Sequence, residues 1–135
     1  MIYLDTSTCV GLLRGDISVS PATMRSVAPT EFGIPVVVES ELLIAAAQSR
    51  DAERNTQIVR QFLLPFEKVP YDSSCRRLHL ESAGAPTGTN ILVIAAMAMR
   101  HDATLLTCSP DLYRRIPGLK MVECGNDLGE SLRLC

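Results

Sequence analysis

Three acidic residues follow short apolar runs in the first third of the chain. Asp5 comes directly after the run at residues 1–4, and Glu39 and Glu41 follow the run at residues 34–38. Ligands of open α/β sheets bind at the carboxyl ends of the strands, so these acids are candidates for a functional site. Carboxylates there can hold Mg²⁺, which takes oxygen ligands and lets a substrate phosphate complete its coordination. The simpler alternative is that Asp5 and Glu39 only complement the N-termini of the helices that follow.

Other ligand-binding and catalytic motifs of α/β proteins are absent from the sequence. No glycine-rich turn follows the first apolar run and no GxxxxGK[ST] occurs, which excludes a Rossmann dinucleotide site and a P-loop. No nucleophile elbow supports a Ser-His-Asp triad. His79 and His101 stand alone, and we interpret His101 as a residue that compensates a helix dipole near a C-terminus.

The cysteines favour a reducing compartment. They form an odd, scattered set without a CxxC pair or a nearby histidine, which is poor material for a disulfide framework or a zinc site. The five are Cys9, Cys75, Cys108, Cys124 and Cys135. We expect Cys9 and Cys108 to behave as small buried hydrophobic residues.

Length and charge indicate one globular cytoplasmic domain. A chain of 135 residues is the size of a single domain, and a net charge of −2 argues against a protein that coats DNA by positive charge. Local basic patches at Arg76–Arg77 and Arg114–Arg115 stay open as an alternative to solvated helix faces.

Asp5 interrupts the first apolar stretch, so no secretory signal is expected, and the longest apolar run is too short to span a membrane.

Apolar runs and helical patterns alternate along the chain. This predicts an α/β fold of the three-layer type, with a mostly parallel central sheet flanked by helices, in one domain over residues 1–135 with a weakly ordered tail after about residue 125. Asn90 is expected to cap the last long helix, which is apolar almost all round and therefore buried. Expected strands are 1–4, 34–38, 66–71, 103–107 and 120–123; expected helices are 9–14, 41–50, 52–64, 73–82 and 91–100. Thr6 or Ser7 would cap the first of these helices and Gly15 would end it, and we expect a loop and a short helix at 18–29 and a turn at 86–88.

Several segments carry a resemblance to a known family, the PIN domains of VapC-type toxins. The opening IYLDTS resembles the family's L-D-T-N start, and VVVESELLIAAAQS resembles the segment whose A-E-L-L-x-G carries an acid. GAPTGTN followed by IAA resembles G-x-P-I-G-x-N-D-x-x-I-A-A, and ATLLT and IPGL resemble the closing A-T-L-V-T and V-P-G-L. In order and spacing, the resemblance covers nearly the whole chain: residues 2–7, 36–49, 84–96, 103–107 and 116–119.

The resemblance implies an endoribonuclease that uses Mg²⁺ or Mn²⁺. Asp5 matches the first metal acid and Glu41 the second, so both would be catalytic and metal-binding residues. Family members pair with a VapB-like antitoxin and usually form homodimers. Arg114 and Arg115 could then steer the RNA substrate.

The sequence also departs from the family pattern at its acidic positions. Ile91 stands where the family has its third metal acid, Ser109 stands at the fourth position, and Ser7 replaces the usual Asn. Compensating oxygen ligands would come from Asn90, Ser109 or Asp111. Two functions therefore compete: a VapC-like ribonuclease with activity reduced by Ile91, and a catalytically inactive PIN module that binds RNA or an antitoxin.

Overall fold

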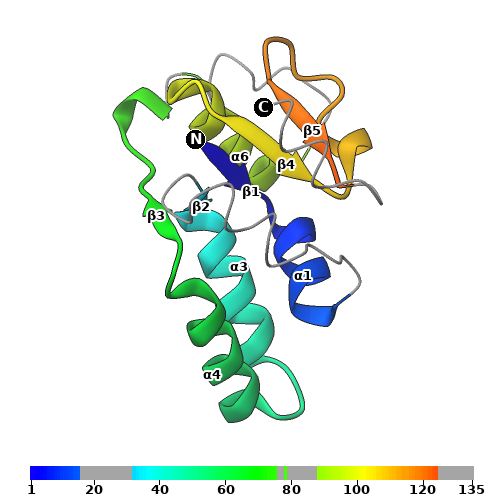
Figure 1. The fold of residues 1–135 in the computed structure, drawn as a ribbon. Helices are drawn as coiled ribbons and strands as arrows, with labels where there is room; N and C mark the ends of the chain where they lie inside the picture. The colour runs from blue at the N-terminus through cyan, green and yellow to red at the C-terminus, as the bar shows by residue number, and fades with distance from the viewer. Residues whose placement is uncertain (16–31, 76–77, 79–87, 125–135) are drawn as a thin grey trace.

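The structure is a computed structural model that describes residues 1–15, 32–75, 78 and 88–124. Its elements follow in the order strand, helix, strand, two helices, strand, helix, strand, 3₁₀ turn and strand (Figure 1). They are β1 (Ile2–Leu4), α1 (Thr6–Arg14), β2 (Phe32–Pro35), α3 (Val36–Ala47), α4 (Ala52–Leu63), β3 (Glu67–Val69), α6 (Thr89–Arg100), β4 (Thr104–Thr107), η2 (Pro110–Leu112) and β5 (Met121–Glu123).

The five strands form one sheet in the order β3-β2-β1-β4-β5, and every neighbouring pair is parallel. The first strand is thus the central one: Tyr3 aligns with Gly33 of β2 on one side and with Leu105 of β4 on the other. The α/β class with a parallel sheet flanked by helices, expected from the sequence, is confirmed.

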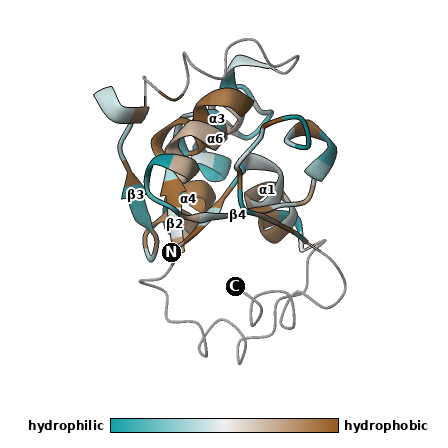
Figure 2. Ribbon diagram, turned by 90° about the horizontal axis from the view of Figure 1, so that it is seen from above, coloured by the Kyte–Doolittle hydropathy of each residue, from teal (hydrophilic) through white to brown (hydrophobic). Residues whose placement is uncertain are grey.

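The core is built from the central strands and α6. Leu4, Ile34, Leu105 and Met97 are at most 1% exposed. Most of α3 and α6 carry hydrophobic residues (Figure 2), and in α6 the side chains from Ile94 to Ala98 are all buried, as its apolar sequence predicts. Among the described residues, no helix combines the length and apolar character needed to cross a membrane.

Local signals account for the ends of α1. Asp5 is the N-cap residue, since its side chain accepts a hydrogen bond from the backbone N–H of Thr8. Gly15 ends the helix with a φ of 74°, a left-handed conformation that suits glycine. The expected stop at Gly15 is confirmed, whereas the capping role expected of Thr6 or Ser7 belongs to Asp5.

Two predicted boundaries at the start of helices are wrong, and the helix expected to end at residue 50 ends at Ala47. Strand β2 ends at Pro35 and Val36–Val38 form the first turn of α3, because Val38 reaches the core from the helix although β-branched residues favour strands. Helix α6 begins at Thr89 with Gly88 as its N-cap residue, so Asn90 lies inside the first turn. Its side chain has another partner, described below.

Some predictions fall outside the described residues. They are a loop and short helix at 18–29, the turn at 86–87, the tail after 125, and Arg76, Arg77 and His79. Of the helix expected at 73–82, residues 73–75 and 78 are described, and they are helical.

Candidate functional site

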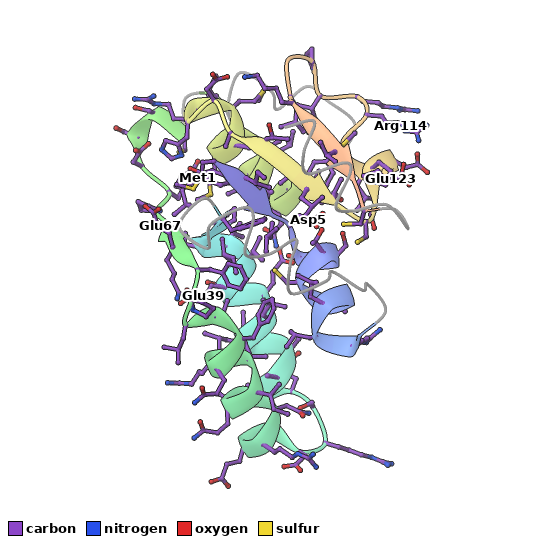
Figure 3. All side chains as sticks on the ribbon, viewed as in Figure 1. Met1, Asp5, Glu39, Glu67, Arg114 and Glu123 are labelled. Carbon is purple, nitrogen blue, oxygen red and sulfur yellow. The ribbon has the colours of Figure 1, made fainter. Side chains whose placement is uncertain are left out.

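Asp5 lies where β1 passes into α1 (Figure 3). Its backbone N–H donates to the carbonyl of Leu106 in β4, which continues the pairing of the two strands beyond Leu4. The residue is 2% exposed, although carboxylates are rarely buried. Asp5 therefore caps α1, as the simpler interpretation of the sequence predicted.

Four donors surround the Asp5 carboxylate. Oδ1 accepts from the backbone N–H of Thr8 at 2.9 Å and from the Thr8 hydroxyl at 2.8 Å. This hydroxyl is also 2.8 Å from the carbonyl oxygen of Leu106, so the two oxygens share its single proton. Oδ2 accepts from the Thr107 hydroxyl at 2.6 Å. The Ser7 hydroxyl reaches both oxygens, at 2.9 and 3.0 Å. These donors match the roughly four lone-pair positions of a carboxylate, so the charge is stabilised without a cation.

Glu41 joins three helices at the same site. Its Oε2 accepts from the hydroxyl of Thr6 at 2.8 Å, and its Oε1 accepts from the side-chain amide of Asn90 at 2.9 Å. Thr6 directly follows Asp5 in α1, and Asn90 lies in the first turn of α6. Glu41 in α3 is therefore held beside Thr6, the residue that follows Asp5. The side chain of Asn90 bonds Glu41 and for this reason does not cap α6.

Tyr113 places a buried hydroxyl near both acids. The residue is 1% exposed, and its hydroxyl has no hydrogen-bond partner among the described residues. Burial raises the pKa of Tyr113 well above its ordinary value, and the charge of Asp5, an interaction of the hydroxyl with the Asp5 side chain and the charge of Glu41 raise it further. Tyr113 therefore brings a hydroxyl to Asp5 without forming a hydrogen bond of good geometry, and the sequence did not single this residue out.

The described surroundings of Asp5 and Glu41 fit a hard divalent cation. Neither carboxylate forms an ion pair with a lysine or arginine in the described part of the chain. Their neighbours are hydroxyls and one side-chain amide. Oxygen donors of this kind suit Mg²⁺ or Mn²⁺ better than softer metals.

The other candidate residues of the sequence, Ser109, Asp111 and Arg115, differ in their burial and in their contacts. Ser109 is half-buried, and its backbone N–H donates to the Thr107 hydroxyl at 3.0 Å. Asp111 is highly exposed and pairs with Arg114 at 3.0 Å, and no contact joins it to Asp5 or Glu41 in the described part of the chain. Arg115 is exposed as well.

Ile91 occupies the first turn of α6, which contains no acidic residue. Its side chain is partly buried and packs against the hydrophobic core. The helix N-terminus nearest Glu41 thus presents an amide at residue 90 and an apolar side chain at residue 91.

Two hydroxyl residues of this site were missed in the sequence. Thr8 and Thr107 are both fully buried and both donate to Asp5. A threonine at a strand end or in a first helical turn is too common to stand out. The signal that could have found Thr107 is its place at the carboxyl end of a strand, the same rule that selected Asp5.

Comparisons of sequence find one family and two named relatives that resemble the chain. It matches the PIN domain family over residues 2–118. It is 30% identical over 127 residues to Ribonuclease VapC2 of Rickettsia felis, which covers 88% of this chain and 95% of that protein. It is 26% identical over 127 residues to the tRNA(fMet)-specific endonuclease VapC of Salmonella typhimurium, covering 87% of this chain and 93% of that protein.

Solved structures agree with the sequence matches. The fold is similar to a chain in the crystal structure of VapBC2 from Rickettsia felis bound to a promoter DNA fragment, with a TM-score of 0.78 and 28% identity over 91% of this chain and 98% of that one. It is equally similar to a chain of DNA-bound VapBC from Salmonella typhimurium, with a TM-score of 0.79 and 26% identity over 92% and 98%. With its parallel sheet and buried Asp5, the chain belongs to the PIN domain family.

Proposed function

We propose that this chain is the toxin of a VapBC-type toxin–antitoxin pair, an endoribonuclease that depends on Mg²⁺ or Mn²⁺. The observation that carries the proposal is the joining of buried Asp5 to Glu41 through Thr6 at the carboxyl end of the central strand. Relatives named as a ribonuclease and a tRNA endonuclease support RNA as the substrate. Relatives solved as VapBC complexes support an antitoxin partner.

Asp5 and Glu41 would hold the cation, which would polarise the scissile phosphate and lower the pKa of an attacking water. Thr8 and Thr107 fix the orientation of the Asp5 carboxylate through short hydrogen bonds from opposite sides. Asn90 does the same for Glu41. Both carboxylates are thereby pre-oriented, which lowers the entropy lost when a ligand binds.

The Ser7 hydroxyl is the contact of Asp5 that a cation has to replace. It is shared between both carboxylate oxygens at 2.9 and 3.0 Å, and Ser7 is only half-buried, whereas Thr8 and Thr107 are fully buried. A shared hydrogen bond is easier to break than a short linear one. Rotation of Ser7 would free an oxygen of Asp5 and break the hydrogen bond that the Ser7 hydroxyl accepts from the backbone N–H of Cys108 at 3.2 Å. The half-buried Ser109 would offer a further hydroxyl.

The surface and the partners complete the proposal. Arg115 is exposed and would steer RNA, together with Arg114 when its pairing with the exposed Asp111 opens. Such surface pairs contribute little, so RNA phosphate can compete with Asp111 for Arg114. A VapB-like antitoxin, a homodimeric toxin and a cytoplasmic site of action belong to the same proposal.

Ile91 favours a second candidate function. With no acid in the first turn of α6, the site offers two carboxylates in place of three, and the cation would be held weakly. The activity would then be reduced, and at the limit the chain would be a PIN module that binds RNA or an antitoxin without cleavage.

A cleavage assay with matched variants tests the proposal. With Mn²⁺, and with tRNA(fMet) among the substrates, we expect wild type to cleave RNA slowly and Glu41→Gln to lose about tenfold or more. The control is Glu53→Gln, which removes the same charge from an exposed position in the first turn of α4. Equal rates for wild type and Glu41→Gln would reject this site. Absence of cleavage together with retained RNA binding would establish the second function.

A further inference from the structure

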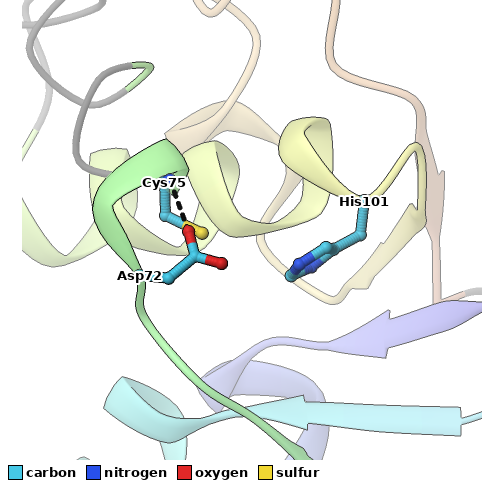
Figure 4. A group of neighbouring side chains, drawn as sticks. All are labelled: Asp72, Cys75 and His101. Carbon is cyan, nitrogen blue, oxygen red and sulfur yellow. Dashed lines mark hydrogen bonds between the residues drawn. The ribbon is translucent and has the colours of Figure 1, made fainter.

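Three side chains with metal-binding atoms converge at a second place in the fold. One ligand atom each from Asp72, Cys75 and His101 lies within 4.8 Å of the other two. Figure 4 shows the three side chains pointing toward one another, with the Asp72 carboxylate between the thiol and the imidazole. Asp72 and Cys75 follow β3, whereas His101 directly follows α6.

This cluster is separate from the acidic site. Asn90, which binds Glu41, lies in the first turn of α6, and His101 lies just past its last turn. At about 1.5 Å per residue, these two ends of α6 are roughly 16 Å apart. One ion cannot serve both places.

Hydrogen bonds already orient two of the three ligands. Asp72 Oδ1 accepts from the backbone N–H groups of Ser74 and Cys75, both at 3.0 Å, so Oδ2 is left to face the cluster. The Nδ1 atom of His101 is bonded to the hydroxyl of the buried Tyr3 at 2.8 Å. That leaves Nε2 for a metal, in the arrangement by which an outer hydrogen bond usually fixes a metal-binding histidine.

We propose that Asp72, Cys75 and His101 form a binding site for a divalent d-block metal of the zinc class. One sulfur, one nitrogen and one oxygen are the donor types that Zn²⁺ takes, and three protein ligands leave one position open. In a tetrahedral site such atoms lie about 3.3–3.6 Å apart. The side chains must therefore close by about 1 Å, which is feasible because Asp72 and His101 are exposed.

The charges balance in the metal-bound form. A doubly charged cation is neutralised by the Asp72 carboxylate and the Cys75 thiolate, while His101 stays neutral. Burial raises the pKa of the Cys75 thiol, so the metal must displace its proton. The Asp72 side chain raises this pKa further through its hydrogen bond with the thiol and its negative charge, whereas the nearby Arg100 lowers it. The Cys75 side chain is 0% exposed, which shields the metal–sulfur bond from water.

Such a metal would tie the segment after β3 to the end of α6 across 26 residues of sequence. The site needs no nuclease activity, so it stands or falls independently of the proposed function. Its expected effect is a rise in thermal stability with added metal, because a ligand that binds only the folded state stabilises it.

Cobalt provides the probe, since Co²⁺ bound to a thiolate gives a charge-transfer band in the near ultraviolet. We expect the reduced full-length chain to show this band with one equivalent of Co²⁺, and Zn²⁺ to remove it by competition. Cys75→Ser should abolish the band. Cys108→Ser, which changes a half-buried cysteine beside Thr8, should leave it intact.

Two further variants leave the buried Cys75 unchanged, so they test the site even if Cys75→Ser fails to fold. His101→Gln should weaken Co²⁺ binding at least tenfold, and Tyr3→Phe should weaken it by about tenfold through loss of the outer hydrogen bond. Absence of a thiolate band in wild type would overturn the proposal. So would a band that survives in Cys75→Ser or is lost in Cys108→Ser, because the metal would then lie elsewhere.

Discussion

Ile91 stands at a helix N-terminus that faces Glu41 through its neighbour Asn90. An aspartate at this position would gain the favourable interaction of a carboxylate with a helix N-terminus and could contribute an oxygen ligand. In the absence of metal it would also be repelled by Asp5 and Glu41, so the gain should appear only when the cation is bound.

We therefore expect Ile91→Asp to bind Mn²⁺ about tenfold more tightly than wild type, close to 1.4 kcal/mol, and to cleave RNA faster. Titration calorimetry and a cleavage assay on the same samples measure both. Ile91→Asn is the matched control, because it removes the same apolar side chain from its partly buried position without adding charge. Equal gains for the aspartate and asparagine variants would attribute the effect to packing and contradict a missing metal ligand.

The buried hydroxyl of Tyr113 gives a second prediction for a single residue. It lacks a hydrogen bond of good geometry and interacts only with the side chain of Asp5, so its desolvation outweighs this contact and Tyr113→Phe should raise the free energy of unfolding by up to about 1 kcal/mol. Tyr3→Phe is the control with the opposite sign: its hydroxyl is paired with His101, and its loss should lower stability by about 1 kcal/mol in a chelator. Urea unfolding followed by circular dichroism measures both. A destabilised Tyr113→Phe would mean that its hydroxyl is paired in solution.

Sequence reasoning found the acids but not their surroundings. Asp5 and Glu41 stood out because each follows an apolar run, and a strand end is where function is expected. Thr107 could not be linked to Asp5, because their contact depends on β4 lying beside β1 in the sheet. The scattered cysteines likewise gave no sign that Cys75 lies close to His101, because the two residues meet only after α6 has packed.

At the level of elements, the contact between β1 and β2 is unusually close at Gly33. A Cβ added there would lie 2.9 Å from Cε1 of Tyr3 and 3.0 Å from Cγ2 of Val69. Both neighbours are buried, so neither can move away freely. Glycine at this position lets three adjacent strands pack with a tyrosine ring between them.

Gly33→Ala should therefore destabilise the fold by about 1–3 kcal/mol, as overpacking of a core does. Gly88→Ala is the control, because nothing lies within 4 Å of its added Cβ and its φ of −68° suits alanine. We expect the control to change stability by no more than about 0.5 kcal/mol, since a weaker N-cap is offset by lower entropy of the unfolded chain. Thermal unfolding compares the two. Similar losses in both variants would contradict the role of Gly33.

The element order was predictable, while its boundaries were less so. Strongly patterned segments such as residues 52–64 were predicted to within one residue of α4. The error at Val36–Val38 arose because β-branched residues suggest a strand, whereas the pairing of β2 with β3 ends at Pro35 and the chain must turn there. Tertiary contacts decided the boundary against local preference.

At the scale of the whole molecule, apolar side chains remain exposed on the α3–α4 hairpin. Ile44 is 56% exposed, Ile58 45% and Leu64 70%, the last just after α4. Isolated exposed leucines and isoleucines are common, but these three lie on one pair of packed helices. A second copy of the chain could cover them by a twofold contact.

We expect the protein to be a dimer at tens of micromolar, with twice the chain mass of 14.7 kDa by light scattering. Ile44→Glu should shift it to the monomer by placing a charge in the contact. Leu112→Glu, which changes an exposed leucine in η2, should leave the dimer unchanged. A monomeric wild type would contradict the dimer, and a dimeric Ile44→Glu would move the contact to another surface.

The central position of the first strand has a consequence for synthesis on the ribosome. Strand β1 has β2 on one side and β4 on the other, and Thr107, which bonds Asp5, is 102 residues further along the chain. At about 5–20 residues per second, translation takes roughly 5–20 s to cover that distance. During this time one edge of β1 has no partner, and the carboxylate of Asp5 lacks the hydroxyl that completes its shell. The nascent chain therefore cannot assemble the proposed active centre until β4 has emerged, which would protect the cell's RNA while the protein is being made.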